Sequence, residues 1–286
     1  MAEARDQYLT NDDGLPCPEI GTWSETKHRL TGLYASLFST GMKYKWNQRV
    51  YIDLYAGSGF GRIKNSHRVI LGSPLIALTV TDRFDKYIFC EEKPEFVDAL
   101  RTRVQRFATD ANVEFIEGDC NIKVDEIVKA IPPFSHNNKV LSLCFVDPFD
   151  LGIKFRTLEK LSRFYVDFLC LLALHMDANR NYNNYVSENS HKVDEFLGTG
   201  EWRKLWPSEQ IKGKDFPKFL AEQFAASMQT LGYKPPPYYK MKEVKYPEKN
   251  VSLYRLALFS RNEKAYEFWD DVLKYSTDQT AFDFGA

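Results

Sequence analysis

Four carboxylates follow short apolar runs at regular intervals through the first half of the chain. They are Asp53, Glu91, Asp119 and Asp147, and the first opens the glycine-containing stretch Asp53-Leu54-Tyr55-Ala56-Gly57-Ser58-Gly59. In open α/β sheets, ligands bind beyond the carboxyl ends of the strands. An ordered set of acids at this spacing therefore predicts a site for a nucleoside-containing ligand.

The chemistry of each residue type indicates its expected role in this site. Gly57 and Gly59 lack a Cβ atom, so the backbone there can approach a ligand closely. An acid that closes the second strand, here Glu91, is placed for ribose hydroxyls, as in dinucleotide-binding folds. Asp119 can accept a hydrogen bond from an adenine amine. The predicted cofactor-binding residues are Asp53, Tyr55, Gly57, Gly59, Glu91, Asp119 and Cys120.

Each of these residues also has a purely structural alternative. The two glycines could form only a tight turn, and Glu92 is a rival for the ribose. Asp119 could cap a helix that begins near Asn121. Asp147-Pro148 could be an ordinary turn at the end of a strand. Four acids at strand–helix spacing, taken together, favour the ligand site.

The glycine stretch departs from the dinucleotide fingerprint. That fingerprint leads directly into a helix, whose N-terminus binds a pyrophosphate. Here residues 60–71 intervene before Gly72-Ser73-Pro74. A ligand without a pyrophosphate, such as S-adenosylmethionine (AdoMet), therefore fits the pattern better than NAD does.

The acceptor side is predicted at the ends of the fourth and fifth strands. A flipped base needs aromatic stacking and hydrogen-bond partners. The expected catalytic residues are Asp147, Pro148 and Phe149, with Asp147 as the general base and His175 in reserve. The expected substrate-binding residues are His175, Arg180, Tyr182 and Tyr185. The alternative is that the aromatic side chains, above all Trp202 and Trp206, only pack this segment onto the core, and that His175 is structural.

Short apolar runs that alternate with helical periodicity must position these residues. The alternation predicts a Rossmann-like α/β fold with a mostly parallel, doubly wound sheet. An apolar run at residues 251–260 and a helix after it complete the fold, with this last strand antiparallel. Ser24 is the predicted N-cap of a first helix. The other strands are predicted at residues 49–55, 87–90, 113–116, 140–146 and 166–174.

The chain is predicted to have four parts. Residues 1–22 are expected to be an irregular lead-in, and residues 23–175 the AdoMet-binding core. Residues 176–250 are expected to be a helical, aromatic insertion that covers a substrate or a partner. Residues 251–286 would complete the core.

Composition limits the classes of function. The chain has 286 residues, a net charge of −1 and no run of about 18 apolar residues. Its start lacks the apolar run of a signal peptide. Its five cysteines form no CxxC pair, so buried thiols are expected and a metal site is not. These features predict a soluble cytoplasmic protein without a membrane segment.

A nucleic-acid role would have to rest on a local patch, because the net charge is close to zero. The segment at residues 234–245 (KPPPYYKMKEVK) combines four lysines with two adjacent tyrosines. Basic residues interleaved with aromatic ones suit a nucleic-acid backbone. A solvated loop beside an edge strand is the alternative.

Residues 53–59 resemble the D-x-F-x-G-x-G form of motif I in nucleic-acid methyltransferases, with Tyr55 in place of the phenylalanine. The wider pattern is similar to the three-Cys-motif partner family of bacterial proteins. This resemblance covers about residues 20–275. It rests on Trp23…Lys27, DLYAGSG, Gly72-Ser73-Pro74-Leu75-Ile76-Ala77-Leu78, Phe89-Cys90-Glu91, Phe145-Val146-Asp147-Pro148-Phe149, Asp177…Arg180-Asn181 and Leu253-Tyr254-Arg255-Leu256.

The resemblance implies a class I methyltransferase fold, AdoMet as cofactor, and a separate partner protein with a three-cysteine motif like that of radical-AdoMet enzymes. Residues 147–149 also look like a shortened D-P-P-Y motif of amino-methyltransferases. In those enzymes the aspartate and a proline carbonyl hold the target amine. Here the second proline is missing and the aromatic residue comes one position early.

Three hypotheses follow. The first is an AdoMet-dependent methyltransferase that acts on nucleic acid or a nucleotide-like acceptor. The second is a non-catalytic or partner-dependent AdoMet-binding subunit that works with a three-Cys-motif protein. The third, an NAD-type oxidoreductase, is disfavoured by the interrupted glycine loop.

Overall fold

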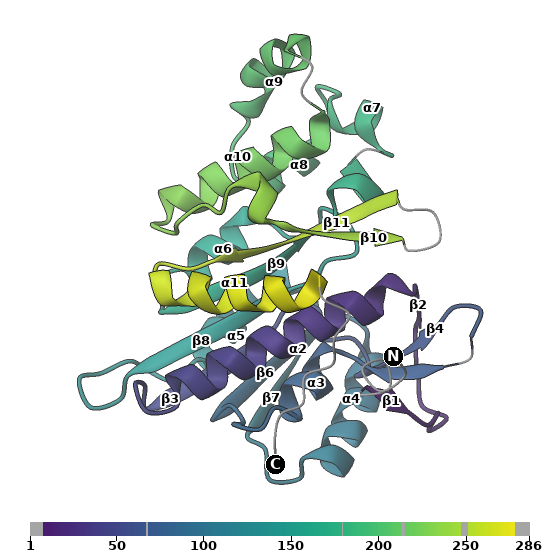
Figure 1. The fold of residues 1–286 in the computed structure, drawn as a ribbon, viewed down its shortest axis with the longest axis vertical. Coiled ribbons are helices and arrows are strands. Elements are labelled where there is room, and N and C mark those ends of the chain that lie inside the picture. The colour runs from purple at the N-terminus through teal and green to yellow at the C-terminus, as the bar shows by residue number, and fades with distance from the viewer. Residues whose placement is uncertain (1–7, 67, 179, 213–214, 247–250, 278–286) are drawn as a thin grey trace.

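A seven-stranded, mostly parallel sheet runs through the middle of the molecule (Figure 1). The computed structural model describes residues 8–66, 68–178, 180–212, 215–246 and 251–277. The strand order is β10-β11-β9-β8-β3-β6-β7. The strands are β3 (Gln48–Asp53), β6 (Lys86–Glu91), β7 (Val113–Glu117), β8 (Val140–Val146), β9 (Val166–Leu172), β10 (Lys242–Tyr246) and β11 (Val251–Phe259).

The five central strands pair in parallel, and β11 is antiparallel to both of its neighbours. Strands β8 and β9 are buried along their whole length, as expected for strands that are covered on both faces. This topology confirms the Rossmann-like α/β fold of class I methyltransferase type that the sequence predicts. The antiparallel β11 lies between β9 and β10, so the edge strand is β10 and not the last strand of the chain.

Helices cover the two faces of the sheet as two layers. One apolar cluster joins the sheet to α2 (Trp23–Met42), α3 (Ser73–Leu78), α4 (Pro94–Phe107) and α11 (Glu263–Thr277). The other joins it to α5 (Cys120–Ala130) and α6 (Phe155–Leu161). The predicted N-cap at Ser24 is wrong, because α2 begins one residue earlier and Ser24 is buried in its first turn.

A second, four-stranded sheet contains part of the segment that was expected to be irregular. Its order is β1-β5-β4-β2, and its strands are β1 (Leu9–Thr10), β5 (Val69–Leu71), β4 (Phe60–Ile63) and β2 (Glu19–Ile20). The residues between the glycine stretch and α3 are therefore a β-hairpin, on which the N-terminal segment pairs. The described part of the predicted lead-in thus contains two short strands, and residues 1–7 lie outside the described residues.

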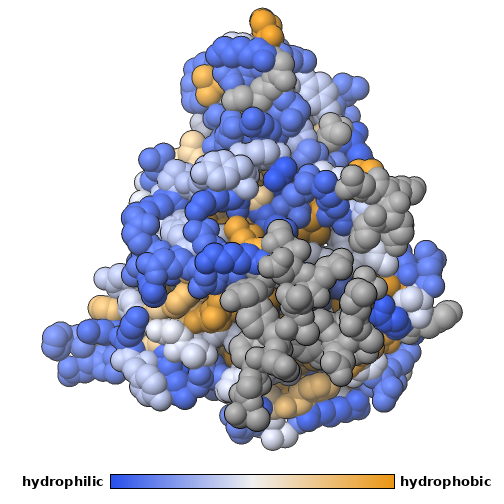
Figure 2. Space-filling view, viewed as in Figure 1, coloured by the Kyte–Doolittle hydropathy of each residue, from blue (hydrophilic) through white to orange (hydrophobic). Residues whose placement is uncertain are grey.

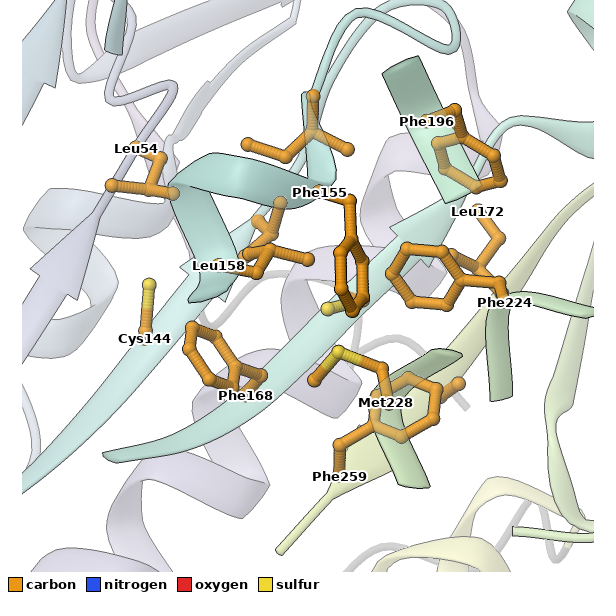
Figure 3. Packing of buried hydrophobic residues seen from close by; sticks show 14 of the residues in the cluster. Leu54, Cys144, Phe155, Leu158, Phe168, Leu172, Phe196, Phe224, Met228 and Phe259 are labelled. Atoms are coloured by element: carbon orange, nitrogen blue, oxygen red, sulfur yellow. The ribbon is translucent and has the colours of Figure 1, made fainter. Parts of the chain in front are cut away.

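The segment after β9 folds mainly into helices, which share a core with the sheet. Figure 3 shows Phe196, Phe224 and Met228 packed beside Phe168 and Phe259 of the sheet. Because these side chains belong to one cluster, the helical segment is fixed to the sheet. Its elements are η1 (Leu174–Ala178), α7 (Tyr182–Tyr185), α8 (Lys192–Leu197), α9 (Trp202–Ile211), α10 (Phe216–Thr230) and η2 (Tyr238–Lys240).

The described helices include no membrane-spanning candidate, since none is both long and apolar enough. The last part of the predicted insertion is not helical, because residues 242–246 form β10 of the main sheet. Residues 179, 213–214, 247–250 and 278–286, which belong to the predicted insertion and C-terminal part, lie outside the described residues.

Candidate functional site

The glycine loop and the end of the second parallel strand are in direct contact. The Gly57 amide donates to Glu91 Oε2 at 2.8 Å, and the Lys93 amide donates to Glu91 Oε1 at 3.0 Å. A carboxylate has about four lone-pair sites, so Glu91 can still accept hydrogen bonds from a ligand. The rival Glu92 is exposed and forms no hydrogen bond or ion pair with the described residues of the loop, so the geometry favours Glu91.

Gly57 faces open space in a left-handed backbone conformation. Its φ is +62°, and a Cβ built on it would meet no atom within 4 Å. The conformation favours glycine, and the open space lies where the backbone could approach a ligand.

Gly59 is required for packing instead. Its φ is +84°, and a Cβ there would lie 2.8 Å from Leu100 Cδ1 and 3.2 Å from Leu75 Cδ1. The close approach that the sequence predicted is therefore to helices α3 and α4. For Gly59, the observed contacts therefore indicate a structural role and not a contact with a ligand.

Asp53 lies beneath the loop and has no exposed surface. Its Oδ1 accepts from the Tyr55 amide at 3.2 Å, while its Oδ2 is buried without a hydrogen bond of standard geometry. Burial raises the pKa of Asp53 to about 7, and the nearby Asp147 carboxylate acts in the same direction, against the Ser73 hydroxyl. Asp53 thus supports the loop from inside.

Asp119 caps helix α5, as the structural alternative proposed. Its Oδ1 accepts from the Asn121 amide at 2.8 Å and from Asn121 Nδ2 at 2.9 Å. Its other oxygen accepts no hydrogen bond from the described part of the chain and remains available to a ligand. Cys120 is buried beside the Tyr55 hydroxyl, and burial raises the pKa of its thiol to about 12. The thiol is therefore protonated near neutral pH and packs as an apolar group.

Asp147 is held by a lysine from the first long helix. Lys27 Nζ lies 2.6 Å from Asp147 Oδ2, and the two side chains are 13% and 14% exposed. The pair lies at the carboxyl end of β8, next to Asp53 at the end of β3. A cation therefore stands among the acids at this edge of the sheet. Charge-assisted contacts of this length are strong and fix the orientation of the carboxylate.

The two residues after Asp147 differ in exposure. Pro148 is buried, whereas the Phe149 side chain is 83% exposed. An exposed phenylalanine at the rim of a site is free to contact an acceptor or another protein.

Asp177 organises the chain after β9. Its Oδ2 accepts from the Leu151 amide at 2.8 Å and from the Tyr185 hydroxyl at 2.7 Å. Its Oδ1 accepts from Asn181 Nδ2 at 2.7 Å. Asp177 thus ties the loop that follows Asp147 to the start of the insertion, through a π-helix of the kind that is frequent at functional sites.

Two of the four predicted substrate contacts have structural partners. Tyr185 is buried and bonded to Asp177, as described above. The Tyr182 hydroxyl accepts from Trp206 Nε1 at 3.0 Å, and its ring packs edge-on against Phe216 at 5.1 Å. Trp202 is 1% exposed and bonds to an acid of α8. For these aromatic side chains, packing of the insertion is the observed role.

Arg180 remains an accessible candidate, whereas the Nε2 atom of His175 is buried. Arg180 is exposed, and His175 is half-buried with its Nε2 atom lacking a hydrogen-bond partner. Burial lowers the pKa of His175, so its imidazole is neutral near pH 7. A neutral imidazole can accept a proton, which keeps His175 as the reserve base.

Several residues of this edge were not in the predicted site. Lys27 was noted only as part of the family resemblance. Its contact with Asp147 could not be predicted, because the two residues are 120 positions apart in the sequence. Arg103 is wholly buried and donates to Ser58 O at 2.7 Å and to Asp13 Oδ1 at 2.6 Å, which anchors the glycine loop to the N-terminal segment. No group of three or more potential metal ligands occurs in the described part of the chain.

Comparisons with known proteins give similarity of fold. No family model and no curated protein matches the chain. Among solved structures, it is similar to protein LPL1258 from Legionella pneumophila, with 10% identity over 88% of this chain and 92% of that chain, and a TM-score of 0.47. It is also similar to the O-methyltransferase TomG from Streptomyces achromogenes in complex with SAM, with 11% identity over 89% and 93% of the two chains and a TM-score of 0.40.

A third similar structure is TYW2 from M. jannaschii in complex with AdoMet. The identity is 14% over 79% of this chain and 75% of that chain, with a TM-score of 0.35. Similarities of this size assign no activity or substrate. The function is therefore argued from the residues of the chain itself.

Proposed function

We propose that this chain is an AdoMet-dependent methyltransferase of class I type. One observation carries the proposal. The Gly57 amide donates to the Glu91 carboxylate at 2.8 Å, at the carboxyl ends of the adjacent parallel strands β3 and β6. The space in front of Gly57, where a side chain would begin, is open. That edge of the sheet is where α/β folds bind nucleoside ligands.

The residues present fit AdoMet. Glu91 would hold the ribose hydroxyls, and the free oxygen of Asp119 would accept from the adenine amine. Asp147 would place negative charge near the sulfonium, which is a cation, and Asp53 would do so in its ionised form. Asp53 has the further role of holding the loop, through the Tyr55 amide. When bound, AdoMet supplies an electrophilic methyl group.

Asp147 would position the acceptor and take its proton. Lys27 occupies Oδ2 of Asp147, so Oδ1 is the oxygen that would accept a hydrogen bond from an acceptor amine or hydroxyl. Such a contact aligns the nucleophile, and alignment accounts for a large part of catalysis in transfers of this kind. Loss of the proton from the acceptor to Asp147 completes the transfer. Exposed Phe149 and Arg180 lie on the sequence segments that border this point, and a nucleotide-like acceptor suits them.

A partner-dependent form of the same function is the second candidate. The Lys27–Asp147 ion pair and the 83% exposure of Phe149 favour it, because the acceptor carboxylate is already paired and an apolar side chain is uncovered. It also agrees with the resemblance to the three-Cys-motif partner family, which implies a separate partner protein. In this form, a partner protein would cover Phe149 and present the acceptor.

Transfer of tritium from labelled AdoMet to pools of RNA and DNA tests the proposal. We expect incorporation by the wild-type protein, and a loss of about 100-fold or more in Asp147→Asn, the scale of a lost general base. Asp150→Asn is the matched control, because Asp150 lies in the same loop and pairs with Lys192 at 3.1 Å. We expect it to keep activity within about threefold.

The outcomes separate the two forms. Incorporation that survives Asp147→Asn contradicts the role given to Asp147. Bound AdoMet without incorporation, restored when a three-Cys-motif protein is added, supports the partner-dependent form. No incorporation under either condition contradicts the enzyme hypothesis.

A further inference from the structure

A polar hollow lies at the opposite edge of the main sheet from the glycine loop. Its volume is about 490 Å³. Residues 43–47, which precede β3, and residues 136–139, which precede β8, line it. The glycine loop follows the other end of β3, so the strand separates the two places by roughly 20 Å. These segments form the projection at the lower left of Figure 1, and Figure 2 shows that surface as hydrophilic.

Three lysines line the hollow without a matching number of acids. Lys43 Nζ pairs with Asp82 at 2.5 Å. Lys45 and Lys139 are exposed, and no described carboxylate forms an ion pair with either of them. None of the described lining residues is an aspartate or a glutamate. The hollow is therefore positive, although the chain as a whole is not.

Aromatic rings stand among these lysines. Tyr44 is 91% exposed, and Lys43 Nζ lies 5.6 Å from the centre of its ring. Trp46 packs against Tyr165 at 5.4 Å, which in turn packs against Phe134 at 4.9 Å. An uncovered ring beside a cation offers a stacking surface to a base.

The hollow is formed before any ligand arrives. The Asn47 amide donates to the Lys139 carbonyl at 3.0 Å, and the Lys139 amide donates back to Asn47 Oδ1 at 2.8 Å. Gln48 Nε2 also donates to Asn138 Oδ1 at 3.0 Å. These bonds join the two lining segments, so binding would require little ordering of the backbone.

The lysine-rich segment that the sequence singled out is less suitable. Lys234 pairs with Glu263, Lys240 with Asp270, and Lys245 with Glu243. Lysines that are already paired give little net attraction for phosphates. A nucleic-acid surface is therefore better supported at the hollow than at β10.

We propose that the hollow binds single-stranded nucleic acid, with phosphates beside Lys45 and Lys139 and a base stacked on Tyr44. Positive grooves interleaved with exposed aromatic side chains are the common device of single-strand binding. The inference goes beyond the proposed methyl transfer. It assigns a second contact surface, by which a long substrate would be held away from the reacting edge.

Fluorescence anisotropy with a labelled 12-nucleotide oligouridylate, in the absence of AdoMet, tests this inference. We expect Lys45→Gln/Lys139→Gln to raise the Kd at least tenfold, and Tyr44→Ala to raise it about fivefold or more, the lower range for loss of one stacked base. The slope of log Kd against log salt should fall by about 1.4 in the lysine variant, because two phosphates lose their partners.

The matched control is Lys64→Gln/Lys129→Gln, which removes two exposed lysines outside the hollow. We expect it to change the Kd less than threefold. An equal loss of affinity in the control, an unchanged Kd in Lys45→Gln/Lys139→Gln, or equally tight binding of polyglutamate would overturn the inference. Binding of the oligonucleotide without any methyl transfer would support the hollow and contradict only the proposed enzyme activity.

Discussion

The ionisation of Asp53, which lies beneath the glycine loop, makes the stability of the fold depend on pH. The Asp53 carboxyl group is fully buried, it bonds to the Tyr55 amide, and its neighbours include both Asp147 and Lys27. With a pKa of about 7 in the folded chain, it carries a proton over much of the range where the unfolded chain has lost it. A cationic ligand nearby would favour the ionised form.

We predict that Asp53 lowers stability as pH rises from about 4 to 7. The folded state binds the proton more tightly than the unfolded state, so this contribution is fully present below pH 4 and is lost by pH 7. The slope is about 1.4 kcal/mol per pH unit, and Asp53→Asn should remove it. Urea unfolding at several pH values measures the difference between the two proteins.

Two other buried groups also contribute to the pH dependence of the unfolding free energy. Burial also raises the pKa of Asp167 to about 7, and it lowers the pKa of His28 well below its usual value. Both groups are present in wild type and in Asp53→Asn, so the difference between the two slopes belongs to Asp53. Parallel curves for the two proteins would contradict the assignment.

Sequence analysis can single out a residue when the residue belongs to a local motif. Gly57 and Glu91, which the sequence marked separately, are in direct contact in the structure. The Lys27–Asp147 pair could not be derived from spacing, because only the packing of α2 on the sheet brings the two side chains together. The packing of Tyr182 and Tyr185 could not be separated from substrate binding, since both roles require aromatic residues.

Helix α4 holds the N-terminal segment against the glycine loop mainly through Arg103. Arg103 is fully buried, donates to Asp13 and Ser58, and stacks on the ring of Phe60 at 4.1 Å. The described part of the first 22 residues therefore belongs to the structure that supports the site.

We predict that Arg103→Ala lowers the unfolding free energy by about 3 kcal/mol, because it leaves the largely buried Asp13 without its main partner. For a chain of this size the melting temperature should fall by roughly 6 °C or more. Arg106→Ala is the control, since Arg106 also contacts Asp13, at 3.2 Å, but is 54% exposed. A change of less than 1 kcal/mol is expected there, and equal effects of the two variants would show that burial is not the cause.

Elements were predicted where the apolar pattern is strong. The sequences of β8 and β9 are almost wholly apolar, so their burial could be predicted. Strands β1 and β2 have two residues each, too few to show a period. Strand β10 escaped detection because it is a lysine-rich edge strand, and such strands favour charge over alternation.

At the scale of the whole molecule, the sheet has two chemically different edges. The carboxyl edge carries Asp53, Glu91, Asp119 and Asp147, the last of which pairs with Lys27, whereas the amino edge carries the lysine-lined hollow. A net charge of −1 conceals this separation. The opposite signs suit a cationic cofactor at one edge and a polyanion at the other, which composition alone could not predict.

Calorimetric titration of AdoMet, S-adenosylhomocysteine and NAD into wild type, Gly57→Ala and Glu91→Gln tests the central claim most directly. The account predicts binding of the two adenosyl ligands and not of NAD. It predicts at least tenfold weaker binding in both variants, because a methyl group on Gly57 enters the open space and Glu91→Gln loses the charged acceptor. Gly57→Ala should remain folded by circular dichroism, since its Cβ meets no atom within 4 Å and one left-handed alanine costs only about 1–2 kcal/mol. Absence of adenosyl-ligand binding to the folded wild type, or unchanged binding in both variants, would contradict it.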